Sequence, residues 1–393
     1  MQTGSAAISP FAEHASGAAK VPMPWHVGVL VAAVFAGAIG GPWDISWHMT
    51  IGRDTFWTPA HLAIYLGGAT AGFVCGWLAI RATFLTPAGE RSGAVRCWGG
   101  RAPFGAWVVI WGAIAMLTAG PFDDWWHNAY GLDVKIISPP HVLLFLGGVA
   151  ARLGAWLLVL REQNRTGRAA PAWLFCIVAG LLIEELSVIF TAEFWPNREH
   201  ESSYFLVTAL AYPGLLVAIS RATRLRWGTT IAAASYMLFV GGLIWILPLF
   251  AAEPKLGPIY HHVSHMVPPP FPQWLIVPAF AIDAVRARIG TGPGLRPALL
   301  FAIAVGFLFV ALFLPTQWVF SEFYLSPAAD NWFFGGNRIW GYVSSPAGTP
   351  VLSEFWGDET TWSWLWVARA FVAATATAFL GRQFGNWMNE VKR

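Results

Sequence analysis

Apolar segments of about twenty residues recur along this 393-residue chain and constrain its fold more than any other feature. A helix of that length rises about 30 Å, the thickness of the hydrocarbon layer of a bilayer. Backbone N–H and C=O groups find no water in lipid, so each segment is expected to be helical. Ten spans are predicted, at residues 25–43, 60–81, 103–121, 140–161, 171–192, 203–221, 227–250, 271–288, 297–316 and 363–382.

Composition agrees with a chain whose solvent is mostly lipid. Hydrophobic residues make up 56% of the sequence, charged residues 11%, and there are 24 tryptophans. The net charge of +3 gives no support for nucleic-acid binding. Cys75, Cys97 and Cys176 fall in predicted helices or an inner loop, which favours neither a disulfide nor a Cys-rich metal site. The sequence therefore predicts an all-α polytopic membrane protein of about ten helices.

The distribution of lysine and arginine predicts the orientation in the membrane. Most of the 24 basic residues fall in both tails and in alternate loops, and positive loops stay on the cytoplasmic side. The remaining loops hold only Arg53, Lys135, Arg198, Lys255 and Arg338. We therefore expect a protein of the bacterial inner membrane with both termini on the cytoplasmic side. No cleaved signal pattern is recognised in the first twenty residues.

Histidines gather on the side opposite to the basic loops. Eight of the ten fall in, or at the mouths of, the outer loops: His48, His61, His127, His141, His200, His261, His262 and His265. Histidine is the commonest metal ligand and a proton carrier near neutral pH, so this segregation places chemistry at the outer face. Interfacial anchoring beside tryptophan is the alternative interpretation.

Two copies of one motif lie about 80 residues apart. Residues 41–68 read GPWDISWHMTIGRDTFWTPAHLAIYLGG, and residues 120–148 read GPFDDWWHNAYGLDVKIISPPHVLLFLGG. Both contain Gly-Pro-aromatic-Asp, Trp-His, Gly-x-Asp, Ser/Thr-Pro-x-His and Leu-Gly-Gly, with one extra residue before the last histidine of the second copy. Two predicted helices separate the copies, which keep the same orientation. The pattern predicts a parallel duplicated two-helix unit.

The spacing within each copy indicates a metal site. Asp44 and His48 are four residues apart, on one face of a helical turn, and His61 follows a proline at the start of the next helix. One carboxylate and two imidazoles suit copper, zinc or iron and leave positions open for water, oxygen or substrate. The second copy repeats the set with Asp123, His127 and His141. Asp54 and Asp133 are interpreted as partners of the ligands or as turn residues.

Both spacings resemble those in a membrane-embedded subunit of the copper membrane monooxygenases, the family of particulate methane monooxygenase and ammonia monooxygenase. Asp44-x3-His48-x12-His61 is similar to one copper motif of that family, and Asp123-x3-His127-x13-His141 to the second, in which the family carries asparagine where Asp123 stands here. The resemblance covers residues 40–150. It implies two copper sites that face one cavity near the outer leaflet, where dioxygen is activated and a C–H or N–H bond is hydroxylated.

The motifs and the apolar segments together divide the chain into regions. We expect a cytoplasmic tail (1–22), the duplicated metal-binding unit (23–165), further membrane helices with a His-rich outer loop (166–316), an outer loop rich in aromatic residues and glycine (317–362), and a last helix with its tail (363–393). The 317–362 segment contains neither His nor Cys, so it cannot build the copper site of a cupredoxin.

Other polar residues stand out against the apolar background. The His-rich loop carries His261, His262, His265 and Met266, which predict either a third metal site or a polar loop. A second set is expected deep in the membrane: Arg152, Glu184 and Glu185, interpreted as an ion pair between helices or as a proton path. His200, with Glu193 and Glu199, is expected in a solvated loop.

The leading hypothesis is a subunit of a copper-dependent monooxygenase that hydroxylates a small apolar substrate or ammonia, with zinc as the alternative metal. No haem, flavin or iron–sulfur motif is recognised, so electrons would come from partner subunits. Two further hypotheses stay open: a protein that captures and delivers copper, and a non-catalytic metal-binding subunit of a larger membrane complex.

Overall fold

The apolar segments form helices in the computed structural model, which describes residues 23–52, 55–87, 93–131, 137–289, 292, 294–344, 352–356 and 361–391. The helices are α1 (Trp25–Thr50), α2 (Pro59–Ile80), α3 (Phe104–Tyr130), α4 (Pro139–Thr166), α5 (Ala169–Glu193), α6 (Ser202–Ala222), α7 (Gly228–Ile246), α8 (Ile276–Ile289), α9 (Leu295–Tyr324), α10 (Leu352–Phe355) and α11 (Trp364–Glu390). Within these ranges, nine helices are long and apolar enough to cross a membrane. The fold is that of an all-α polytopic membrane protein, as predicted.

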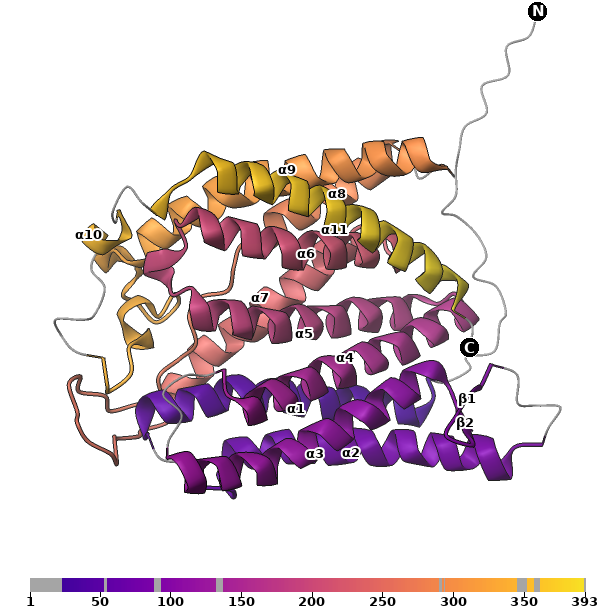
Figure 1. Cartoon of the computed structure of the whole chain (residues 1–393), viewed down its shortest axis with the longest axis horizontal. Helices are drawn as coiled ribbons and strands as arrows, with labels where there is room; N and C mark the ends of the chain where they lie inside the picture. Colours follow the sequence, from indigo (N-terminus) through magenta and orange to yellow (C-terminus); the bar gives the residue numbers. More distant parts are fainter. Residues whose placement is uncertain are drawn as a thin grey trace, which may run out of the picture.

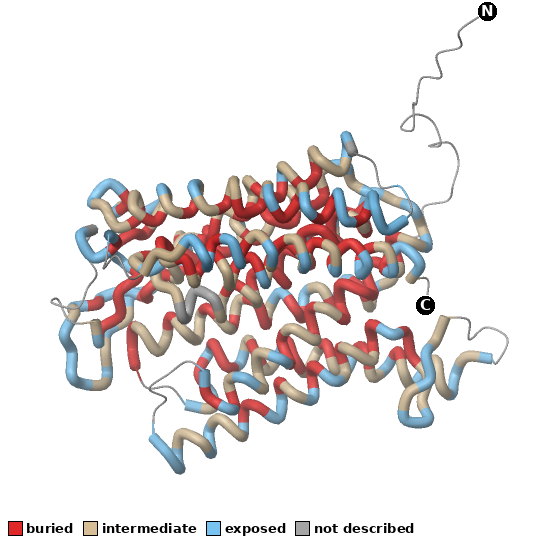
Figure 2. The backbone as a smooth tube through the Cα atoms, turned by 45° about the horizontal axis from the view of Figure 1, so that its top comes forward, coloured by how far each residue is buried: buried red, intermediate tan, exposed pale blue. Residues whose placement is uncertain are grey.

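The long helices run side by side between two ends of the bundle (Figure 1). At one end α1 connects to α2, and we call it the histidine end. At the other, the arginine end, α2 connects to α3 through the antiparallel strands β1 (Val95–Cys97) and β2 (Gly100–Ala102). α5 and α7 lie between α1–α4 on one side and α6, α9 and α11 on the other. Buried positions follow the facing sides of the helices (Figure 2).

The α1–α2 and α3–α4 hairpins pack through equivalent glycines. A Cβ on Gly67 would lie 2.7 Å from the carbonyl oxygen of Ala33, and a Cβ on Gly147 would lie 2.8 Å from that of Gly112. Gly67 and Gly147 occupy the same place in the Leu-Gly-Gly motif, and Ala33 and Gly112 each lie eleven residues before the aspartate of their copy. Only glycine allows the two backbones to approach this closely.

The eighth predicted span differs from a continuous helix. Its helical part, α8, has 14 residues, which is too short to cross about 30 Å of hydrocarbon. Residues 267–275 precede it as extended chain that runs from the histidine end into the bundle. At the far end of α8, Arg286 donates to the carbonyl of Ser220 at the end of α6, so the segment as a whole reaches the arginine end.

Proline and side-chain acceptors make this extended segment tolerable inside a membrane. Pro268, Pro269, Pro270 and Pro272 have no N–H group to satisfy. Between residues 267 and 274, the four remaining N–H groups each donate to a side chain: Val267 to Thr50 Oγ1 at 2.8 Å, Phe271 to Tyr324 OH at 3.2 Å, Gln273 to Tyr236 OH at 3.1 Å, and Trp274 to Gln317 Oε1 at 3.0 Å. Protein thus replaces the water that lipid cannot supply.

Several boundaries differ from the sequence-based prediction. α1 and α3 continue past the Gly-Pro pair of each motif, with Pro42 and Pro121 inside the helices. Membrane helices accept an internal proline when neighbouring helices pack over the break. α9 extends to Tyr324, so the outer aromatic segment begins later than residue 317, and α11 extends through most of the predicted C-terminal tail. The predicted N-terminal tail lies outside the described residues.

Candidate metal centres

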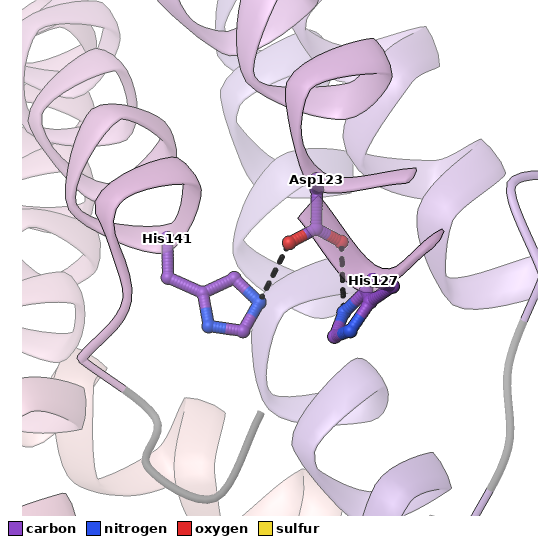
Figure 3. Close-up of side chains that lie close together, drawn as sticks. All are labelled: Asp123, His127 and His141. Carbon is purple, nitrogen blue, oxygen red and sulfur yellow. Dashed lines mark ion pairs between the residues drawn. The ribbon is translucent and has the colours of Figure 1, made fainter. Parts of the chain in front are cut away.

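The second motif copy brings three metal-ligand side chains together at the histidine end. Asp123 and His127 lie one turn apart near the end of α3, and His141 is the third residue of α4. Asp123 Oδ2 is 3.5 Å from His127 Nε2, and Oδ1 is 3.3 Å from His141 Nε2 (Figure 3). Across the described part of the chain, this is the one group of three or more His, Cys, Asp or Glu residues with ligand atoms all within 4.8 Å.

The second copy also fixes which nitrogen of His127 faces the aspartate. The Nδ1 atom of His127 lies 3.2 Å from the carbonyl oxygen of Gly131. A carbonyl can only accept, so Nδ1 carries the proton and Nε2 keeps its lone pair, as in most metal-binding histidines. Gly131 ends α3 with a φ of +87°, a conformation that glycine adopts without strain. Among the residues that the structure describes, none forms a hydrogen bond with the buried Nε2 atom of His127.

The first copy forms a similar but looser cluster. Asp44 Oδ1 is 3.1 Å from His61 Nε2, whereas Asp44 Oδ2 is 3.8 Å from His48 Nε2. His61 Nδ1 donates to the carbonyl oxygen of Thr55 at 3.0 Å, which leaves Nε2 facing the aspartate. The His48 side chain is 32% exposed, against 14% for Asp44. His48 is thus the most exposed of the three side chains and the histidine farther from the Asp44 carboxylate.

Proline positions the third histidine of each cluster. α2 begins at Pro59 and α4 at Pro139, where the fixed φ of proline favours the first helical turn and its missing N–H costs nothing. His61 and His141 are the third residues of these helices. Each imidazole consequently points back from a helix start toward the end of the preceding helix.

Both clusters contribute to one cavity of about 490 Å³, which we call the shared cavity. Asp44 and His48 line it from α1, and His127 and His141 line it from α3 and α4. His141 is also near enough to interact electrostatically with the Asp44 carboxylate. The walls are mostly apolar and include Ile45, Met49, Ile64, Met116, Val142, Leu144, Phe145 and Ile189. Polar groups on apolar walls are typical of small-molecule sites.

A buried ion pair lies deeper in the same cavity. Arg152 Nη1 is 2.8 Å from Glu185 Oε2, and Arg152 Nη2 is 3.7 Å from Glu184 Oε2. Arg152 is 3% exposed and Glu184 1%. Gly148, the last glycine of the second motif, makes room for this pair, because a Cβ there would overlap Glu185 and lie 2.9 Å from Arg152 Nη1. The structure thus joins α4 and α5 through these charges.

The His-rich loop does not gather its candidate ligands. Met266 is 4% exposed and packs with Ile51, Leu243 and Leu247, so its sulfur lies in an apolar cluster. His262 and His265 are exposed, and His265 Nδ1 bonds to Ser264 Oγ at 3.0 Å. Asp54 and Asp133, the expected partners of the metal ligands, lie outside the described residues.

The prediction of a solvated loop around His200 is wrong. Glu199 is 5% exposed and His200 4%. The Glu199 carboxylate accepts hydrogen bonds from Gln317 Nε2 at 2.7 Å and from the Ser321 hydroxyl. Burial raises the pKa of Glu199 to about 7, and the two hydrogen bonds only partly oppose this. The short helix α10 covers His200 with Phe355, and the two ring centroids are 4.6 Å apart. No local sequence pattern predicts this contact.

Sequence reasoning also missed Trp195 and Tyr342, which line the shared cavity from distant segments. The Tyr342 N–H donates to the carbonyl oxygen of Met49 at 3.0 Å, and Trp195 stacks on Trp340. Comparisons with protein-family models, curated proteins and solved structures find no match to this chain.

Proposed function

We propose that this chain is the metal-binding membrane subunit of a copper-dependent monooxygenase. The observation that carries the proposal is the lining of one cavity by Asp44 and His48 of the first motif copy together with His127 and His141 of the second. Asp123, His127 and His141 would hold one ion, and Asp44, His48 and His61 the other. Copper, when bound, supplies the redox chemistry that dioxygen activation requires, and carboxylate with imidazole is a ligand set that copper accepts, as does zinc.

The proposal treats the two hairpins as a parallel duplicated unit. Their equivalent glycine contacts and their matching Asp–His distances support this. The chain's own residues would orient the ligands: the carbonyl oxygens of Thr55 and Gly131 hold the Nδ1–H of His61 and His127. Mostly apolar walls favour a small hydrophobic substrate beside the ligands, with ammonia, a small polar molecule, as the alternative substrate. Partner subunits in the membrane would supply electrons.

The proposed orientation follows from the basic residues. In a bacterial inner membrane, the arginine end and both termini would lie on the cytoplasmic side. The histidine end would lie on the periplasmic side. A periplasmic site has direct access to dioxygen and to copper.

The test is incorporation of labelled dioxygen in native membranes, where partner subunits remain in place. Membranes with wild-type protein should transfer ¹⁸O from ¹⁸O₂ into a short alkane or into ammonia. His127→Ala and His48→Ala should lose this activity, whereas His262→Ala, an exposed histidine outside both clusters, should retain it. Labelled product that persists in both ligand variants would contradict the proposal. Copper binding without any labelled product would instead favour capture and delivery of copper.

A further inference from the structure

A second, smaller cavity of about 70 Å³ adjoins the shared cavity, and we call it the side chamber. The two cavities have wall residues in common: Pro42, Ile45, Met49, Val188 and Trp195. The side chamber is further lined by Ser46 of α1, Glu184 and Ser187 of α5, Tyr236 of α7, and the proline-rich segment before α8. Those prolines offer carbonyl oxygens but no N–H groups.

The side chamber contains polar atoms that the protein leaves without hydrogen bonds. Both carboxylate oxygens of Glu184 and the hydroxyl of Ser46 are buried and make none within the described structure. The volume is several times what one water molecule needs, and water is expected where a buried space offers two or more polar partners. These atoms and this volume together favour a hydrated chamber.

The charges around Glu184 do not balance if every group is ionised. Among the residues that the structure describes, Arg152 is the one cation that faces it, and Arg152 makes its short contact with Glu185. Tyr236 and Ser187 face it from the chamber walls as neutral hydroxyl groups. One guanidinium beside two carboxylates leaves one uncompensated negative charge among buried side chains, which is costly unless one carboxylate takes up a proton.

Glu184 and Glu185 border different cavities. Glu184 lines the side chamber, Glu185 lines the shared cavity, and Arg152, also on the shared cavity wall, contacts both. Beyond the chamber, Ser187 Oγ bonds to Tyr212 OH at 2.9 Å, and Tyr212 and Tyr236 both donate to Gln273 Oε1. Hydroxyl groups thus line the chamber beside the Glu184 carboxyl, which makes no hydrogen bond within the described part of the chain.

We propose that Glu184 is a proton-carrying carboxyl group that exchanges its proton with water in the side chamber, next to the shared cavity. In the exchange, the O–H bond of the neutral carboxyl breaks and the proton passes to water, which becomes hydronium. The carboxylate left behind is stabilised by Arg152, and the reverse step reloads it. That this proton serves oxygen chemistry in the shared cavity rests on the proposed function, but the exchange itself needs no metal.

The test is infrared spectroscopy of chelator-treated, full-length protein in lipid, which decides the inference independently of any copper chemistry. Difference spectra between wild type and Glu184→Gln should contain the carbonyl band of a neutral carboxylic acid. Bands of other buried carboxyl groups, such as Glu199, are present in both proteins and cancel. The band should shift within minutes of transfer to D₂O. Glu253→Gln, which changes an exposed carboxylate, should leave it intact.

A second variant identifies the cavity that the proton faces. Ser46 lines the side chamber and not the shared cavity, so Ser46→Ala should shift the frequency of the band while Glu184 stays in place. An unchanged frequency would mean that the protonated carboxyl does not face the side chamber and would overturn the inference. A band that does not shift in D₂O would mean that the side chamber holds no exchanging water, which would also overturn the inference. A band that disappears when sodium chloride replaces choline chloride would identify a sodium site instead. The Ser46→Ala, D₂O and salt measurements remain decisive if Glu184→Gln fails to fold.

Discussion

Single residues set the geometry of the two clusters, and the sequence predicts much of it. An aspartate and a histidine four residues apart share a helical face whatever the tertiary fold, and Pro-x-His at a helix start is equally local. The contact that joins the two helices of each copy is not local: His61 Nε2 lies 3.1 Å from Asp44 Oδ1, and His141 Nε2 lies 3.3 Å from Asp123 Oδ1. Such separations depend on how neighbouring helices pack, which one sequence does not encode in any short pattern.

Gly148 offers a test of the buried ion pair at the residue scale. Gly148→Ala is expected to lower the free energy of unfolding by about 1–3 kcal/mol, because the new methyl group displaces Glu185 from Arg152. Thermal unfolding in detergent measures the change. Gly28→Ala is the matched control, since Gly28 is an exposed helical glycine with nothing within 4 Å of the added carbon, and it should be neutral or stabilising. Equal behaviour of the two variants would argue against the close approach.

Glu199 predicts a pH dependence of stability. Its pKa is about 7 in the folded protein, against a usual value of 4.5, so between these values the folded state binds more protons than the unfolded state. The contribution of Glu199 to stability is therefore greatest below about pH 4.5, falls as pH rises to about 7, and is constant above. The loss amounts to about 3 kcal/mol.

Glu199→Gln isolates this contribution. The variant should unfold with a weaker decline in melting temperature between pH 4.5 and 7 than the wild-type protein, because glutamine does not titrate. Glu354→Gln, which changes an exposed carboxylate, serves as the control. Parallel pH profiles for wild type and Glu199→Gln would mean that Glu199 titrates as an ordinary carboxyl group.

Among the elements, the long helices follow from hydropathy, and the broken eighth span does not. Nine of the ten predicted spans form helices long enough to cross a membrane within the described ranges. The eighth contains Pro272 and directly follows the run Pro268–Pro270, and a helix interior rejects proline. Its backbone depends on acceptors contributed by Thr50, Tyr236, Gln317 and Tyr324, which lie far away in the sequence.

Removing one of these acceptors should destabilise the extended segment. Tyr236→Phe deletes the hydroxyl that accepts from the Gln273 N–H and donates to Gln273 Oε1. The buried Gln273 N–H is then unsatisfied, whereas Oε1 keeps its hydrogen bond from Tyr212 OH. A loss of about 1–3 kcal/mol in the free energy of unfolding is expected. Tyr130→Phe removes a hydroxyl from an exposed tyrosine and should have almost no effect. Equal melting temperatures for the two variants would indicate that water or lipid headgroups can replace the Tyr236 hydroxyl.

For the whole molecule, the decisive feature is the convergence of two distant sequence copies on one cavity. The resemblance to copper membrane monooxygenases predicts such a cavity, and the structure brings Asp44, His48, His127 and His141 to its wall. The cavity is completed by Trp195 and Tyr342, which come from segments without motifs. The pattern of candidate ligands can therefore be predicted from the sequence, whereas the cavity around them depends on how distant segments pack together.

Metal content per chain decides whether the two clusters hold copper. Protein purified in native lipid is analysed by mass spectrometry and copper spectroscopy, for the wild type, His48→Ala, His127→Ala and the control His262→Ala. We expect about two copper ions per chain, one fewer in each ligand variant and no change in the control. Zinc in place of copper, no bound metal, or ligand variants that retain the full content would contradict this expectation.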